Sequence, residues 1–129
     1  MLNMAAVTTM LPVADLDRAS RFYEHKLGLE PLGRAPDGAM RYRCANAVLA
    51  LLPRPGLHPA EHTAISFEVD DIEKELSELQ AKGVVFEDYD LPELRTVNHV
   101  CVLGSEKAAW FRDSEGNYLC LHQEVAGRG

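Results

Sequence analysis

The sequence contains one internal repeat, which constrains the fold more than any single residue does. The segment TTMLPVADLD at positions 8–17 is answered by AISFEVDDIE at 64–73, and the matched residues lie 56 positions apart. Each copy predicts a β-strand, then an aspartate that caps a helix, then an amphipathic helix. A short apolar strand follows later in each half, at 49–51 and at 119–121. The chain is therefore expected to fold as two copies of one supersecondary unit.

The composition is that of an ordinary globular protein. The 129 residues, 47% of them hydrophobic and 26% charged, suffice for one domain or for two small halves that share a core. No apolar run approaches the ~20 residues of a membrane-spanning helix, and the start of the chain does not resemble a secretion signal. The net charge of −7 argues against nucleic acid as a partner, because binding phosphates requires a basic face. Three cysteines without a CxxC pair do not indicate a disulfide framework, which favours the cytoplasm.

The first half, 5–57, predicts the element order β-α-β-β-β. Asp15 or Asp17 is placed to cap the helix, and Gly28 ends it because glycine tolerates the left-handed conformation. The three prolines within 53–59 predict a linker, because proline cannot join a regular hydrogen-bond ladder. The expected strands are 7–13, 29–33, 40–45 and 47–52.

The second half, 60–125, repeats this plan. Asp70 or Asp71 caps a helix that ends at Gly83, and the segment 89–98 is an additional loop, either a lid or a cover for a sheet edge. We expect a single α+β domain over 1–129, in which two βαβββ modules form a curved mixed sheet around a cavity with the helices outside. The expected strands are 62–69, 84–87, 99–103, 108–112 and 117–123.

Several motifs resemble those of one known superfamily. The run LPVADLDRA at 11–19, with FY at 22–23 and LGL at 27–29, is similar to the first module of the vicinal oxygen chelate superfamily. FEVDDI at 67–72 and FRDSEGN at 111–117 are similar to its second module. The superfamily includes glyoxalase I, extradiol dioxygenases, fosfomycin-modifying enzymes and bleomycin-resistance proteins. The resemblance implies the fold and a homodimer, but not one function, because the members differ in chemistry.

The resemblance also implies where a metal would be held. In the metalloenzymes of the superfamily, His or Glu on the first and last strands of each module bind a divalent ion. Those positions fall on Thr8, Ala50, Ala64 and Cys120. Alanine has no donor atom, threonine is a poor ligand, and one thiolate does not complete a site that needs three or four ligands. This pattern resembles the metal-free branch, for which we expect no cofactor and an organic molecule in the cavity.

Strand parity indicates which side chains would line that cavity. Because alternate residues of a strand point to one face, His62 is expected to share a face with Glu68, and Tyr118 with His122. Trp110 is either a stacking wall for a flat ligand or a core residue. The candidate ligand-binding residues are Thr8, Met10, Ala50, Ala64, Ser66, Glu68, Trp110, Cys120 and His122.

Two questions stay open for these residues, the role of Cys120 and the presence of a displaced metal site. Cys120 is either a small buried hydrophobe or a nucleophile, which would need a nearby base. A displaced metal site would use His122 and Glu68 with His62 or His99.

Two arginines on one expected strand also have two interpretations. Arg41 and Arg43 either clamp an anionic substrate or form the solvated face of the strand, with Tyr42 turned to the helix side. The order of residues does not decide which face is which.

The sequence favours a cytoplasmic, metal-independent protein that binds a small organic molecule, of the glyoxalase and bleomycin-resistance type. One alternative is a metal-dependent lyase, isomerase or dioxygenase with a non-standard site. Another is a metal-free acid–base catalyst that uses Glu68 and His122. A structural role without a ligand is the third.

Overall fold

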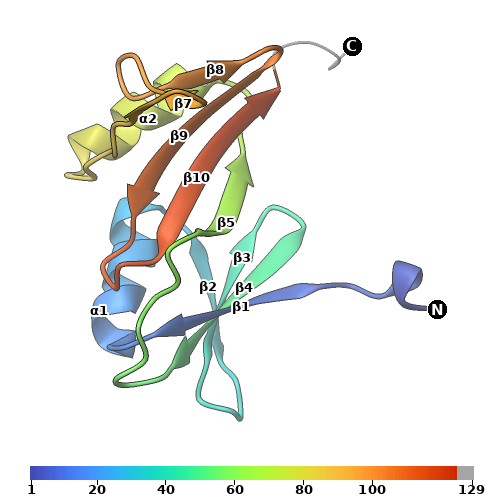
Figure 1. Ribbon diagram of the computed structural model, residues 1–129. Coiled ribbons are helices and arrows are strands. Elements are labelled where there is room, and N and C mark those ends of the chain that lie inside the picture. The colour runs from blue at the N-terminus through green and yellow to red at the C-terminus, as the bar shows by residue number, and fades with distance from the viewer. Residues whose placement is uncertain (125–129) are drawn as a thin grey trace. The chain divides into compact units, whose positions relative to one another are not determined.

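The computed structural model describes residues 1–124 (Figure 1). The chain divides into two compact units, Met1–Pro59 and Ala60–Gly129. Each unit holds one four-stranded mixed sheet and one α-helix that packs on it. The expected α+β class is therefore confirmed.

In the first unit, the sheet has the strand order β1-β4-β3-β2, with β1 parallel to β4 and the other pairs antiparallel. Asp15 is the residue that caps α1, because its carboxylate accepts a hydrogen bond of 3.1 Å from the Arg18 amide. Gly28 has a φ of +75°, as expected where the helical segment ends. The elements are η1 (Leu2–Met4), β1 (Thr8–Val13), α1 (Leu16–Arg21), the π-helical η2 (Phe22–Lys26), β2 (Glu30–Arg34), β3 (Met40–Cys44) and β4 (Ala47–Pro53).

The second unit repeats this order in its main sheet, β5-β10-β9-β8, with β5 parallel to β10. Asp71 caps α2 by accepting from the Lys74 amide at 3.2 Å. A separate two-stranded hairpin, β6-β7, lies between α2 and β8 in the chain. The elements are β5 (Thr63–Glu68), α2 (Ile72–Ala81), β6 (Asp90–Leu91), β7 (Leu94–Arg95), β8 (Cys101–Leu103), β9 (Glu106–Arg112) and β10 (Tyr118–Glu124).

The prediction of a strand at 84–87 is wrong. Only Phe86 in that segment pairs, through one bridge to Phe111 of β9. β8 pairs with β9 only from 106 to 108, so the free edge of β9 accepts the 86–87 segment at its other end. The Phe86 and Phe111 rings lie 5.2 Å apart, so a core contact rather than a ladder fixes this segment.

In each unit, one face of the sheet packs on the helix and forms the core. In the first unit, Tyr42 is fully buried and its hydroxyl donates to Glu24 of η2 at 2.6 Å, so Tyr42 faces the helical side. In the second, Lys107 pairs with Glu73 of α2 at 3.2 Å, and Gln123 accepts from the Ile72 amide at 2.8 Å. Odd-numbered residues of β9 and β10 therefore face α2, and even-numbered residues point to the opposite face.

Candidate functional site

The candidate site is the sheet face of the second unit that points away from α2, here called the open face. The ladder places Ser66, Cys120 and Trp110 in one row and Glu68, His122 and Ala108 in the next. Residues paired across neighbouring strands present their side chains on the same face. Five of the nine candidate residues, Ser66, Glu68, Trp110, Cys120 and His122, are thus brought together.

His122 is the centre of a hydrogen-bonded cluster on this face. Its Nδ1 lies 2.5 Å from Glu68 Oε1, and its Nε2 lies 2.6 Å from Glu106 Oε1. Ser66 Oγ donates to the other Glu68 oxygen at 3.3 Å. Two carboxylates can accept from both ring nitrogens only if both carry a proton, which makes the imidazole a cation.

The carboxylates control the charge of this cluster. Hydrogen bonds to Glu68 and then to Glu106 raise the pKa of His122 above its ordinary value, against a smaller opposing effect of burial. With His122 protonated and both glutamates ionised, the cluster carries one net negative charge. The open face therefore attracts a ligand that donates hydrogen bonds or carries positive charge.

Cys120 is a buried thiol rather than an activated nucleophile. It is 6% exposed, and its Sγ donates to the carbonyl of Leu121 at 3.2 Å. Burial raises the pKa of the Cys120 thiol, which disfavours the thiolate. The imidazole of His122 is occupied by its two glutamates, so a Cys–His pair is not formed.

Trp110 forms an aromatic wall on the same face. It is half-buried, and Tyr89 meets its ring edge-on with the centroids 5.6 Å apart. At the end of β9, two residues beyond Trp110, the Arg112 guanidinium lies 5.2 Å from the Tyr118 ring centroid and pairs with Glu87 at 3.0 Å. Flat aromatic surfaces of this kind stack well against planar ligands.

Ala64 sits at an irregularity of β5. The register shifts between the pairs of Tyr118 with Thr63 and Leu119 with Ile65, so Ala64 is the extra residue of a bulge. Ala64 is exposed, but the bulge interrupts the alternation of side chains, so strand parity does not place Ala64 on the open face with Ser66.

The other three candidates lie in the first unit, on the sheet face opposite α1. Met10, Ala50 and Arg41 form one row across β1, β4 and β3, and Thr8 lies two residues before Met10. Thr8 and Met10 are exposed, whereas Ala50 is 2% exposed and leaves less room than its small size suggested.

The four positions at which the superfamily holds a metal do not fit one. Ala50 and Ala64 have no donor atom, and Cys120 is held as a hydrogen-bonded thiol. Within residues 1–124, no three His, Cys, Asp or Glu side chains are arranged to hold an ion. Of the displaced ligands considered, His99 pairs with Asp88 at 2.9 Å, and His62 is exposed beside the Thr63 carbonyl.

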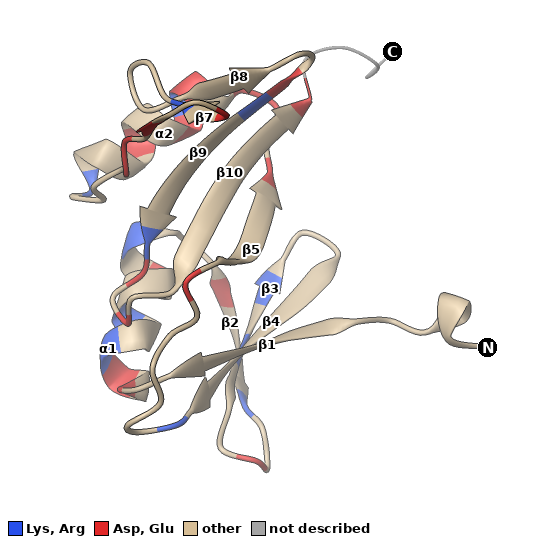
Figure 2. Cartoon of the chain, in the orientation of Figure 1, with Lys and Arg blue, Asp and Glu red and all other residues tan. Residues whose placement is uncertain are grey.

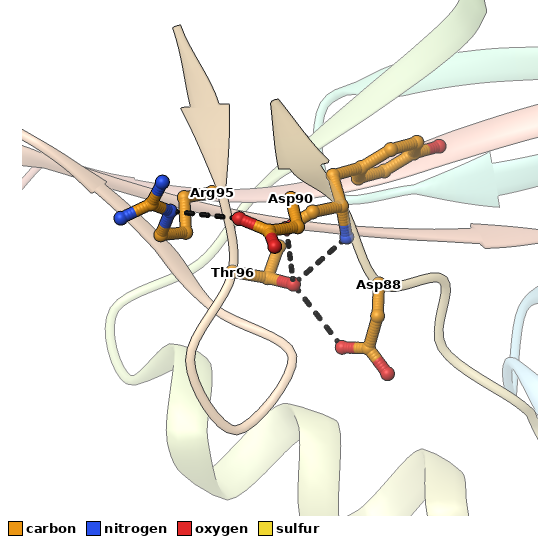
Figure 3. A pocket seen from close by; sticks show the side chains of 5 residues that line it. Asp88, Asp90, Arg95 and Thr96 are labelled. Atoms are coloured by element: carbon orange, nitrogen blue, oxygen red, sulfur yellow. Dashed lines mark hydrogen bonds and ion pairs between the residues drawn. The ribbon is translucent and has the colours of Figure 1, made fainter. Parts of the chain in front are cut away.

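A hollow of about 600 Å³ lies at the β6-β7 hairpin, lined by Asp88, Tyr89, Asp90, Arg95 and Thr96 (Figure 3). None of the nine candidate residues lines it. Its polar groups already satisfy one another, since Arg95 pairs with Asp90 at 2.9 Å and Thr96 donates to Asp88 at 3.1 Å. The hollow therefore belongs to the hairpin, and one of its lining residues, Tyr89, also contacts Trp110 on the open face.

Sequence reasoning missed Glu106 and Tyr89. Glu106 has the same parity as Trp110, but the strand was expected to begin two residues later, at 108, so its position on the open face was not recognised. Tyr89 begins the segment 89–98 that the sequence indicates as an additional loop, but strand parity does not show that this hairpin places Tyr89 against Trp110.

A family model for the glyoxalase/bleomycin resistance protein/dioxygenase superfamily matches residues 5–121. The chain belongs to this superfamily. No protein of the curated set matches at a significant level. Among residues 1–124, no helix is long and apolar enough to cross a membrane.

Several solved structures share the fold. The antibiotic-binding protein TnmS3 from a Streptomyces species is 23% identical with a TM-score of 0.67, over 96% of this chain and 98% of that one. Lactoylglutathione lyase from Agrobacterium tumefaciens is 21% identical with a TM-score of 0.69, over 98% of both chains. The fosfomycin resistance protein FosX from Listeria monocytogenes is 16% identical with a TM-score of 0.70, over 95% of this chain and 91% of that one.

These similarities support the fold of this superfamily member and leave its chemistry open. These three proteins are an antibiotic-binding protein, a lyase and a fosfomycin resistance protein, so one fold serves different functions.

Proposed function

We propose that this superfamily member binds a small organic molecule on the open face of the second unit, without a resident metal. One observation carries this proposal. On the open face, the aromatic side chain of Trp110 lies in the row next to the hydrogen-bonded pair Glu68 and His122. The four positions at which the superfamily holds a metal include two alanines, which supports binding without a metal. The structural similarity to an antibiotic-binding protein supports an antibiotic-like ligand.

The binding mode would be sequestration. A planar ring stacks on Trp110 and removes apolar surface from water, while the ligand's N–H or O–H groups donate to the free carboxylate lone pairs of Glu68 and Glu106. Because His122 is held between those two carboxylates, it fixes their positions before the ligand arrives. Such preorganisation lowers the entropic cost of binding.

The second candidate is metal-free acid–base catalysis by the same cluster. The Glu68–His122 hydrogen bond of 2.5 Å favours it, because a carboxylate that orients an imidazole is a common element of proton transfer. It requires Glu106 to release Nε2 of His122, so that a substrate atom can come within hydrogen-bonding reach of the ring. Product formation in the presence of His122, and none after His122→Ala, would distinguish catalysis from sequestration.

Three further proposals concern the domain organisation, the oligomeric state and the location of the protein. We propose that both units form one domain over 1–129 and that the protein acts as a homodimer, as the family resemblance implies. We also propose a cytoplasmic location, which the three free cysteines Cys44, Cys101 and Cys120 support.

The test uses the single tryptophan of the chain, Trp110, as the reporter. Tryptophan fluorescence is titrated with planar antibiotics that carry amine groups, for wild type and for the Glu68→Gln/His122→Ala double variant. A matched control, Glu78→Gln/His25→Ala, removes the same residue types from exposed positions on the helices. We expect saturable quenching in the wild type and control, and a Kd raised about tenfold or more in the double variant. Unchanged binding in the double variant would remove Glu68 and His122 from the site.

A further inference from the structure

The first unit contains two arginines on the sheet face opposite α1. Tyr42 between them points to the helical side, where its hydroxyl donates to Glu24, so Arg41 and Arg43 point the other way. Both are exposed. This settles the orientation that the sequence left open.

The register places these arginines beside the candidate residues of the same unit. Arg41 is opposite Ala50, which is opposite Met10, and Arg43 lies in the row of Val48 and Thr8. The face therefore combines two guanidinium groups with an apolar strip from β4 and β1. Figure 2 shows the basic positions on β3 beside mostly uncharged β1 and β4.

Neither arginine has a partner among residues 1–124, although acids outnumber bases by 20 to 13 in the chain. Glu30 is opposite Arg43 in the ladder but forms no ion pair with it. Arg95 and Arg112, in contrast, are paired with Asp90 and Glu87. Although the chain has more carboxylates than basic groups, none of the described ones pairs with Arg41 or Arg43.

The spacing of the two side chains suits a single anionic group. Residues two apart on a strand are separated by about 6.7 Å, so two guanidinium forks can converge on one carboxylate, phosphate or sulfonate. Two like charges at that distance repel each other, and an anion between them relieves the repulsion.

We propose that Arg41 and Arg43 form an anion-binding site on this face, which takes an organic carboxylate, phosphate or sulfonate that carries an apolar body. The arginines hold the anionic group, and the apolar body lies along Met10, the exposed apolar side chain in the row of Arg41. The site rests on the first unit alone and does not depend on the assignment of Glu68 and His122.

The experiment compares two fluorescent probes that differ in one group. Anilinonaphthalene sulfonate carries the anion and an aromatic body, and phenylnaphthylamine has the same rings without the sulfonate. Wild type, Arg41→Gln/Arg43→Gln and Arg41→Lys/Arg43→Lys are titrated with each probe. Arg21→Gln/Arg54→Gln is the control, because it removes the same net charge from exposed positions elsewhere in the first unit.

We expect the wild type to bind the sulfonate probe more tightly than the neutral one. The Gln variant should lose about tenfold in affinity for the sulfonate probe alone, and the Lys variant should fall between, because lysine keeps the charge but not the fork. Raising salt from about 0.05 to about 0.5 M should weaken sulfonate binding in the wild type and in the control, and should have the smallest effect in the Gln variant. The proposal is overturned by equal sulfonate binding in the Gln variant, by an equal loss in the control, or by equal wild-type affinity for both probes. Glu68→Gln/His122→Ala should leave the probe difference unchanged, so failure here is distinct from failure of the proposed function.

Discussion

Glu68 and His122 lie directly opposite each other on the parallel strands β5 and β10, and a hydrogen bond of 2.5 Å joins their side chains. The second ring nitrogen of His122 is engaged by Glu106 of β9, so one imidazole links three strands of the sheet. The cluster therefore ties the open face together as well as setting its charge. Its contribution to stability must depend on the protonation of His122.

The first prediction concerns this pH dependence. The folded-state pKa of His122 is raised, so its interactions with Glu68 and Glu106 stabilise the protein fully below the unfolded value of about 6.5 and are lost as pH rises through the folded value. The difference in Tm between wild type and His122→Gln should be largest near about pH 6 and should shrink towards about pH 9. Thermal unfolding followed by circular dichroism measures it.

His58→Gln is the control for that series. His58 is exposed in the linker and has no hydrogen-bond partner among the described residues, so its Tm difference should stay flat across the pH range. A His122→Gln difference that is also flat, or that grows with pH, would contradict the protonated cluster.

The second prediction concerns the start of α2. The Ile72 amide is one of the free donors of the first helical turn, and it donates to Gln123 Oε1 at 2.8 Å. Gln123→Ala removes this acceptor and should lower the free energy of unfolding by about 1 kcal/mol. Urea denaturation measures the change, and Gln80→Ala, at an exposed position of the same helix, should stay within about 0.5 kcal/mol of wild type. Equal effects at both positions would show that the bond is not formed in solution.

The contrast between local and distant contacts explains what could be predicted from sequence. Asp15 and Asp71 were among the expected caps because a capping residue lies within three positions of the amide it serves. Gln123 was not expected as a cap, because it lies 51 positions from Ile72 in the chain. The internal repeat predicts the order of the elements along the chain. The pairing register of the strands, which brings a distant acceptor such as Gln123 to the start of α2, is set only in the folded protein.

The same limit applies to the site. Strand parity correctly grouped Ser66 with Glu68 and Cys120 with His122, because a period of two residues needs no tertiary information. It could not show that His122 would turn to Glu106 or that Cys120 would donate to its own strand. Side-chain rotamers decide those contacts, and they depend on packing that is fixed only in the folded protein.

The third prediction concerns metals. Because two of the four positions implied by the family are alanines, adding Zn²⁺, Ni²⁺, Mn²⁺ or Fe²⁺ to protein purified without chelators should leave its Tm unchanged. The metal content of the purified protein should be far below one ion per chain. A clear shift that disappears in His122→Ala would place a metal at Glu68 and His122 and would favour an enzyme. A shift that persists in that variant would point to other ligands.

The fourth prediction concerns Tyr42, which holds β3 in the orientation that exposes Arg41 and Arg43. Burial, followed by the hydrogen bond to Glu24, raises the pKa of Tyr42 to about 12, so the phenol stays a donor at all ordinary pH values. Tyr42→Phe leaves the Glu24 carboxylate without this partner and should lower the free energy of unfolding by about 2 kcal/mol, because hydrogen bonds to charged groups are stronger than neutral ones.

Tyr118→Phe is the matched control, since the Tyr118 hydroxyl has no hydrogen-bond partner within residues 1–124 and its loss should lower the free energy of unfolding by less than about 0.5 kcal/mol. Urea denaturation compares the two. If both variants lose the same stability, the Tyr42–Glu24 bond does not fix the strand, and the orientation of the two arginines rests on core packing of the ring alone.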